Sequence, residues 1–366
     1  MFPCIRPKPQ PAAVRAAIEE RFQDVTMTQS TAAAPNPWRD LTDPRRAVTV
    51  DDLEAGLKEP VFENLRIPEE LGPVTITIDD HKIKRFAFTQ DDYGAWYLRG
   101  ESPFDGARIG HPALLGNDLV QLFTTRYRAS KTVGFHTEEQ IWFDSPVKLG
   151  ERVTLAGQYV EAYERRGQGY VVMEAQATAE DGRSIVRHRG VEILRTVPGL
   201  IAGRGSSKTT ERSVTGEVAD CARRIEKAGS DVAVGDVLTP LTKVFTAEQT
   251  AVFSRIGEYV RNTHNDLQIA KKGKLPPLIV QGQQEYGAAA ALMARVFGAA
   301  WFTKGWLKMK FINTLQVFDP VSFSGVVTAV GTLADGVRVV ELEVWARRAS
   351  DAKLTAVGWA SCRLPA

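Results

Sequence analysis

The sequence predicts an α+β fold made of two similar halves. Two polar stretches, at 1–46 and 203–218, leave two long blocks at 72–198 and 234–366. Each block contains one largely apolar helical segment, followed by alternating apolar and polar residues that are typical of antiparallel strands. Such self-similarity indicates two copies of one structural unit, which would pair within the chain as a pseudo-dimer.

The composition excludes several kinds of partner. The 366 residues are 43% hydrophobic and 25% charged, with a formal net charge of +2, as in ordinary globular proteins. No dense basic run is interleaved with aromatic residues, which argues against nucleic acid, and no apolar run reaches the roughly 18 residues of a membrane span. Cys4, Cys221 and Cys362 lie far apart and form no metal-binding spacing, which predicts a reducing, cytoplasmic location.

A short motif marks the start of the helical part of each block. Phe-Thr, closely followed by an acidic residue, occurs in RFAFTQDD at 85–92 and in KVFTAEQT at 243–250. In both blocks we expect the end of a strand and then a threonine that caps a helix, with a carboxylate in the first turn.

The central helix of each block is the second shared feature. Largely apolar segments at 107–123 and 277–298 predict buried helices, and His111-Pro112 takes the place in the first block that Gln281-Gly282 takes in the second. Proline suits a helix start because it has no N–H to leave unpaired, and glycine because it lets another group approach the exposed N–H groups. Between Phe-Thr and this helix, the first block is about 13 residues shorter.

Strands complete each block. Residues 140–163 and 169–194 match 309–330 and 337–364, and AEDGRS and ASDAKL mark two hairpin turns. We therefore divide the chain into an extension, a first domain, a linker and a second domain, at 1–46, 47–198, 199–233 and 234–366.

Two stretches of the second block resemble a known family. RNTHNDLQIAKKGKLPPLIVQG (261–282) and FGAAWFTKGWLKMKFI (297–312) are similar to MaoC-like dehydratases and (R)-specific enoyl-CoA hydratases in their tandem form. The family pattern is GD-x-N-P-x-H-x-D, then a G-x-x-x-P-I-x-x-G helix start; His264, Asp266 and Gly282 match its landmarks. The resemblance covers about 260 residues and implies a double hotdog fold, in which two antiparallel sheets each wrap a central helix.

The same resemblance implies a reaction: reversible hydration of a 2-enoyl-CoA to a 3-hydroxyacyl-CoA, a lyase activity without metal or organic cofactor. His264 would be the base that takes a proton from water. Glu258 or Asp266 would share the water and return the proton. The sequence departs from the family pattern, because Tyr259 stands where the family has its catalytic Asp and Asn262 lies one position too close to His264.

Substrate binding is expected around the start of the second central helix. The unpaired N–H groups near Gly282 would stabilise an enolate oxygen, because donors and helix dipole converge there. Asn262, Gln281 and Gly282 are the expected substrate-binding residues. The first block has no counterpart of His264 and is expected to accommodate the acyl part of the substrate.

Each candidate also has a simpler interpretation. Asp266 would cap the helix LQIAKK, Glu258 would be an exposed helix carboxylate, and Asn262 would be a hydrogen-bonding loop residue. The chain as a whole has two rival functions. One is an acyl-CoA thioesterase with Glu285 on the central helix, and the other is a non-catalytic acyl-thioester-binding protein.

Other polar residues are weaker candidates. His111 is expected to be structural, whereas Asp92, Tyr97 and Glu101 form a polar-aromatic group that could be a remnant site. The remaining histidines are expected at the surface: His81, His136 and His188. A small basic group lies where a CoA phosphate would pass, or forms a solvated face: Lys271, Lys272 and Lys274. A homodimer is left open, because the tandem repeat already satisfies the pairing of the two sheets.

Overall fold

The chain divides into two compact units, Met1–Leu53 and Glu54–Ala366. The computed structural model describes residues 49–132, 134–165, 167–195, 214–254, 262–272, 278–334 and 336–364. The described part of the first unit contains one short helix, α3 (Val50–Leu53), and everything that follows concerns the second unit. Among the described residues, no helix is both long and apolar enough to cross a membrane.

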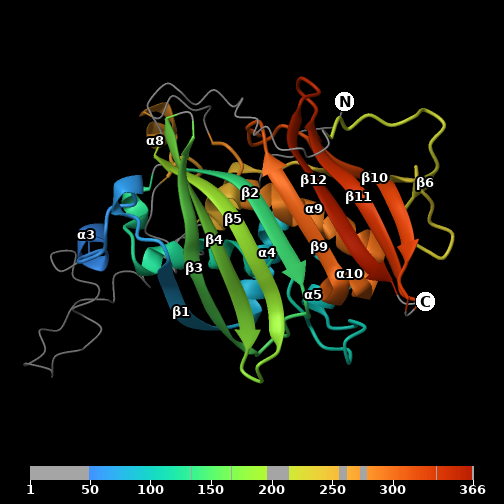
Figure 1. The fold of residues 1–366 in the computed structure, drawn as a ribbon, viewed down its shortest axis with the longest axis horizontal. Helices are drawn as coiled ribbons and strands as arrows, with labels where there is room; N and C mark the ends of the chain where they lie inside the picture. The colour runs from blue at the N-terminus through green and yellow to red at the C-terminus, as the bar shows by residue number, and fades with distance from the viewer. Residues whose placement is uncertain are drawn as a thin grey trace, which may run out of the picture. The chain divides into compact units, whose positions relative to one another are not determined.

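One sheet of twelve strands dominates the second unit (Figure 1). Eleven strands follow in the order β1-β3-β4-β5-β2-β9-β12-β11-β10-β7-β6, and β8 pairs with β10. The strands are β1 (Glu69–Thr77), β2 (Phe135–Phe143), β3 (Arg152–Arg165), β4 (Gln168–Ala179), β5 (Ser184–Arg195), β6 (Arg224–Ile225), β7 (Val237–Leu238), β8 (Leu241–Lys243), β9 (Gly305–Phe311), β10 (Val321–Thr332), β11 (Arg338–Arg348) and β12 (Leu354–Leu364).

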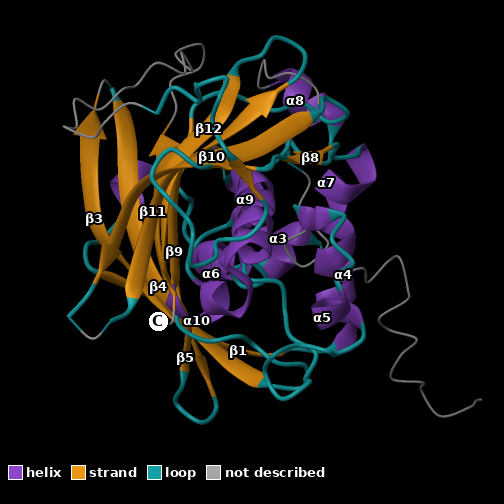
Figure 2. Cartoon of the chain, turned by 90° about the vertical axis from the view of Figure 1, so that its right-hand side faces the viewer, coloured by secondary structure: helices purple, strands orange, loops and turns teal. Residues whose placement is uncertain are grey.

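The helices lie on the concave side of this sheet. Figure 2 shows the sheet curving around α9 and α6, with α4, α5 and α7 on the side of these helices away from most strands. The helices are α4 (Asp80–Gln90), α5 (Ala95–Leu98), α6 (Gly116–Val120), α7 (Ala247–Phe253), α8 (Leu267–Lys272), α9 (Gly282–Phe297) and α10 (Trp301–Lys304), and the 3-10 turns are η2 (Phe62–Asn64), η3 (Gln121–Thr125), η4 (Ala129–Lys131) and η5 (Gly298–Ala300).

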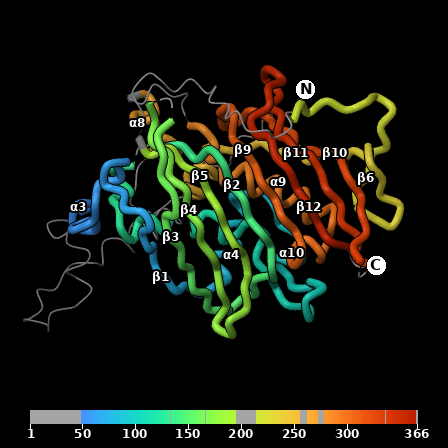
Figure 3. The backbone as a smooth tube through the Cα atoms, in the orientation of Figure 1, coloured from blue at the N-terminus to red at the C-terminus, as the bar shows by residue number. Residues whose placement is uncertain are grey.

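The two halves join through β2 and β9, which lie side by side in the middle of the sheet (Figure 3). The strands are antiparallel, with Gln140 opposite Lys308 near the centre of the ladder. Because this pairing continues the sheet from one half into the other, the halves share one core. The fold is therefore a double hotdog, as the sequence predicted.

Hydrogen bonds at the start of the two central segments confirm the proposed match between the halves. The N–H of Gly110 donates to the Val147 carbonyl at 2.8 Å, and the N–H of Val280 donates to the Leu315 carbonyl at the same distance. His111-Pro112 and Gln281-Gly282 follow these two bonds directly. They therefore occupy equivalent places in the two hotdogs.

α9 is the buried helix expected in the second half. Its sequence GQQEYGAAAALMARVF is rich in alanine, and only Gly282 and Arg295 of its sixteen residues are not buried. A helix that is apolar nearly all round belongs inside a core. Gly298 ends it with φ +59°, a conformation that glycine adopts without a steric cost.

The prediction of one long helix at 107–123 is wrong. That segment forms only the five-residue α6 and the 3-10 turn η3. Glycine and asparagine at its start, Gly116 and Asn117, favour helix weakly. The inter-half contacts also need both residues: a Cβ on Gly116 would lie 3.1 Å from Gln283 Oε1, and Asn117 Nδ2 donates to the Phe253 carbonyl.

The helix cap predicted at the shared Phe-Thr motif is present in only one half. Thr246 caps α7 in a capping box with Gln249, but Thr89 lies inside α4, where its hydroxyl donates to the Phe86 carbonyl. Asp79 caps α4 instead. With Asp79 as the true counterpart of Thr246, 32 residues separate the cap from His111 and 35 separate it from Gln281. The predicted 13-residue difference is therefore a misalignment.

Candidate active site

His264 lies in a loop that is ordered by its own side chains. The Oδ1 atom of Asn262 accepts the His264 N–H at 2.9 Å, and the Oδ1 atom of Asn265 accepts the Asn262 N–H at 2.8 Å. Side-chain amides that bond to nearby backbone favour turns over regular structure. Asn262 therefore positions the loop, which is the simpler of its two predicted roles.

The imidazole of His264 is held against the start of the central helix. Nδ1 lies 2.7 Å from the carbonyl oxygen of Ile279. Because a carbonyl only accepts, Nδ1 carries the proton, and Nε2 keeps its lone pair while the ring is neutral. Burial lowers the pKa of His264 to about 4, although the Ile279 carbonyl acts in the opposite direction. The ring is thus an uncharged acceptor at neutral pH.

Asp266 caps α8. Its Oδ1 atom accepts the N–H groups of Gln268 at 2.8 Å and Ile269 at 3.2 Å, and the residue is only 7% exposed. These bonds satisfy donors at the helix start that have no partner within the helix. The carboxylate therefore has a structural task that accounts for its position beside His264 in the sequence.

The start of α9 presents unpaired backbone donors. Gln281 is the N-cap without a side-chain capping bond, and its carbonyl accepts the N–H groups of Gln284 and Glu285. The N–H groups of Gly282 and Gln283 precede these first intrahelical bonds, so they point out of the helix start. A Cβ on Gly282 would lie 2.8 Å from the Phe311 ring. Glycine at this position is therefore required by the packing of Phe311.

Several predicted residues fall outside the described ranges. Glu258, Tyr259 and Lys274 lie in 255–261 and 273–277, so the predicted role of Glu258 stays a prediction. The side chain of Lys272 is also outside the description. Lys271 is exposed, as expected for a solvated face.

Glu285 is a buried acid in the first turn of α9. It is 2% exposed, and the Thr355 hydroxyl donates to its Oε2 atom at 2.5 Å. Burial raises the pKa of Glu285 to about 8, and the weaker effects of Thr355 and Arg348 lower it only in part. The group is therefore largely a neutral carboxylic acid at neutral pH.

In the first half, a buried histidine lies next to a small cavity. His111 is 3% exposed; Nδ1 accepts the Ala113 N–H at 3.1 Å, and Nε2 lies 3.7 Å from Asp92 Oδ2. Its ring packs on Tyr97, with the centroids 5.5 Å apart. Of the predicted polar-aromatic group, Asp92 and Tyr97 thus meet at His111, whereas Glu101 pairs with Arg99 at the surface.

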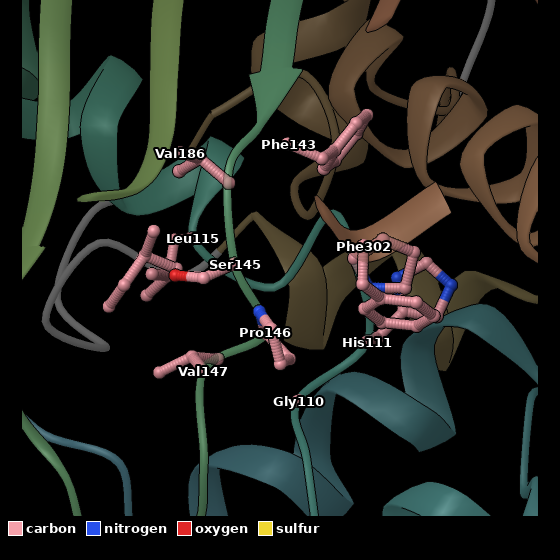
Figure 4. Close-up of a pocket in the computed structure, with 11 residues that line it drawn as sticks. Gly110, His111, Leu115, Phe143, Ser145, Pro146, Val147, Val186 and Phe302 are labelled. Carbon is pink, nitrogen blue, oxygen red and sulfur yellow. The ribbon is translucent and has the colours of Figure 1, made fainter. Parts of the chain in front are cut away.

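This cavity is too small for an acyl chain. Figure 4 shows His111 and Phe302 on one side of it and Leu115, Ser145 and Val147 on the other. Its volume of about 10 Å³ is near the minimum that holds one water molecule. Burial lowers the pKa of His111 to about 4, so the ring is neutral, and its surroundings fit the structural role that the sequence predicted.

One buried polar cluster was missed by sequence reasoning. Nε2 of His136 and Nε2 of His188 lie 3.0 and 2.9 Å from the same Oε2 atom of Glu139. His188 is 2% exposed, so its predicted surface position is wrong; His136 is mostly buried as well, whereas His81 is exposed as predicted. The sequence did contain a signal for His188. Residues two apart on a strand share a face, so His188 lies on the same face as Val186, which is buried. Among the described residues, no group of three His, Cys, Asp or Glu side chains has the arrangement to hold a metal ion.

Several solved structures have a fold similar to that of this chain. A MaoC-like dehydratase aligns with TM-score 0.63 and 16% identity over 83% of this chain and 100% of its own. A protein of Mycobacterium tuberculosis described as a double hotdog aligns with TM-score 0.59 and 12% identity, covering 83% and 98%. A MaoC-like dehydratase from Phytophthora capsici aligns with TM-score 0.56 and 11% identity over 81% of this chain and 97% of its own. No protein-family model and no curated protein matches the sequence. At these identities the likeness establishes the fold.

Proposed function

We propose that the chain hydrates a 2-enoyl-CoA, and in reverse dehydrates a 3-hydroxyacyl-CoA, at the site formed by His264 and the start of α9. One observation carries the proposal: the Nδ1–H of His264 is held by Ile279, which leaves Nε2 as a neutral acceptor beside a helix start. General-base catalysis by a positioned imidazole contributes typically 10²–10⁴-fold to a rate.

In the hydration direction, His264 Nε2 takes a proton from water as the oxygen bonds to C3 of the thioester. The electrons of the C2–C3 double bond move toward the thioester carbonyl, whose oxygen gains charge. The N–H groups of Gly282 and Gln283 are the donors that would meet this oxygen. A proton then adds to C2, so that the elements of one water molecule have been added across the double bond.

The proton that adds to C2 has three candidate donors. Asp266 binds the backbone of α8 through Oδ1, so it is a weaker candidate than the sequence implied. Glu258 keeps its role as the proposed proton donor. His264, once protonated by water, is the other group able to return a proton to C2.

A thioesterase that uses Glu285 as its base is less well supported. With a pKa of about 8, this carboxyl is largely protonated at neutral pH, and the neutral acid is a poor base for activating water. The two reactions have different products, so one assay separates them. Incubation of 2-enoyl-CoAs should give 3-hydroxyacyl-CoA without free thiol. Release of CoA thiol would instead favour the thioesterase, and binding without either product would favour a non-catalytic protein.

A further inference from the structure

A buried polar cluster lies in the sheet of the first half, away from His264. It consists of His136 and Glu139 on β2 and His188 on β5. Glu139 is fully buried, His188 is 2% exposed, and the side chain of His136 is 13% exposed. Glu192, on the same face of β5, pairs with His136 in the strand ladder and has a pKa raised by burial. Such a group of titratable side chains inside a core is costly unless it is fully paired.

The cluster is not fully paired. Within the described residues, Glu139 Oε1 and His188 Nδ1 are buried and have no hydrogen-bond partner. The carboxylate accepts from both imidazoles through Oε2, so Oε1 is a strong acceptor left open. While His188 is neutral and donates through Nε2, its Nδ1 atom is an acceptor as well. Two neighbouring acceptors without a donor call for a group that donates hydrogen bonds.

The fold itself does not require polar groups at these positions. β2 and β9 are equivalent strands that end at Phe143 and Phe311, so Glu139 corresponds to Leu307 in the second half. Likewise His188, opposite Ile141, corresponds to Gly358, opposite Met309. The second half thus builds the same part of the sheet with leucine and glycine. The polar cluster is therefore a feature of the first half alone.

The cluster lies beside the first turns of α9. The His136 ring packs edge-on against Phe311, with centroids 5.4 Å apart, and the same Phe311 ring packs on Gly282. One turn further along α9, Tyr286 donates to the Leu307 carbonyl at 2.9 Å and lies close enough to Glu139 that the carboxylate adds to the rise of its pKa. One phenyl ring therefore separates the cluster from the helix start where the thioester oxygen is proposed to bind.

We propose that His136, Glu139 and His188 bind a hydroxyl group on the acyl part of the thioester substrate. This inference rests on the proposed function, which places the thioester at the start of α9, and on the expectation from the sequence that the first half accommodates the acyl part. The hydroxyl would donate to Glu139 Oε1, the buried acceptor that has no hydrogen-bond partner among the described residues. His136 and His188 hold the carboxylate in its charged form. The hydrogen bonds from both rings, and the charge of His136, whose own pKa is raised beside Glu139, keep the pKa of Glu139 well below its usual range despite burial.

The test uses non-reactive ligands, so that it does not depend on turnover. Binding of hexanoyl-, octanoyl-, decanoyl- and 3-phenylpropanoyl-CoA is compared by calorimetry with that of the corresponding ω-hydroxy and 4-hydroxyphenyl thioesters. The proteins are wild type, Glu139→Gln and the control Glu138→Gln. Glu138 is the adjacent residue on β2, but its carboxylate pairs with Lys308 and Lys310.

In wild type, we expect at least one hydroxylated ligand to bind about tenfold or more tightly than its partner, the size typical of a hydrogen bond to a charged group. Glu139→Gln should lose this preference while Glu138→Gln keeps it. Should Glu139→Gln fold poorly, Glu139→Leu/His188→Gly copies the second half and should show the same loss. Equal binding within every pair, or a preference that survives loss of Glu139, would overturn the inference and leave the proposed hydratase intact. Absence of any acyl-CoA binding would overturn both.

Discussion

The Nδ1 atom of His264 lies 2.7 Å from the carbonyl oxygen of Ile279, two residues before Gln281 caps the central helix α9. This bond links the sequence motif RNTHND to the helix start in three dimensions. It fixes the ring orientation and the neutral tautomer together, which is how a second hydrogen bond prepares a histidine for acid–base work.

The activity should persist in mild acid. Since burial lowers the pKa of His264 to about 4, the base is neutral above that pH and protonated below it. The pH profile of kcat/KM should therefore fall on the acid side only near pH 4, rather than near the ordinary histidine value of about 6.5. An acid limb centred above pH 6 would show that the ring is more solvated than its contacts indicate.

Asp266 should matter for stability more than for chemistry. Asp266→Asn keeps a good N-cap and should retain most activity, whereas Asp266→Ala should lower the free energy of unfolding by about 1 kcal/mol. Urea denaturation and initial rates, measured on both variants, check this. A stable Asp266→Asn protein with activity reduced a hundredfold or more would instead make the carboxylate part of the reaction.

Glu285 should make stability depend on pH. Its pKa is raised in the fold to about 8, so the stability it contributes is fully present below the unfolded value near 4.5 and is lost as pH rises through 8. Relative to Glu285→Gln, wild type should lose a free energy of unfolding on the order of a few kcal/mol between pH 5 and pH 8. If the difference in free energy of unfolding between wild type and Glu285→Gln does not change with pH, the raised pKa of Glu285 is contradicted.

Gly282 should not tolerate a side chain while Phe311 is present. A Cβ there would lie 2.8 Å from the phenyl ring, so Gly282→Ala should cost about 1–3 kcal/mol of stability. In a Phe311→Leu background, Gly282→Ala should lower the free energy of unfolding by less than it does in wild type. Strict additivity of the two changes in a double-mutant cycle would argue against this contact.

Much of the fold was predictable because the second half and the hairpins of both halves follow their local signals. The apolar segment around 282–297 forms the buried helix α9, Thr246 caps α7, and the hairpin turns at 179–184 and 349–354 connect the expected strands. The first half was harder, because inter-half contacts override its helical pattern at Gly116, and because Thr89 repeats a motif without its role.

For the candidate site, the resemblance to a family motif singled out His264 and Gly282. The structure places both at the start of α9, where the His264 ring bonds to the Ile279 carbonyl, and their roles in catalysis and binding stay predictions. The inward position of His188 was indicated only by the alternation of faces along its strand. That of Glu139 was not predictable, because a charged residue on a strand is ordinarily assigned to the solvent face. Their convergence depends on the pairing of β2 with β5, which no local pattern specifies.

The most direct test of the central claim is the loss of enoyl-thioester absorbance in wild type, His264→Ala and His81→Ala. His81 is an exposed histidine of α4, so its variant controls for the loss of an imidazole. With a panel of short, long and ring-bearing 2-enoyl-CoAs, wild type and His81→Ala should turn over at least one substrate at equal rates. His264→Ala should be about 10²–10⁴-fold slower while keeping the same unfolding midpoint. Equal rates in all three proteins would contradict the assignment of His264 as the base.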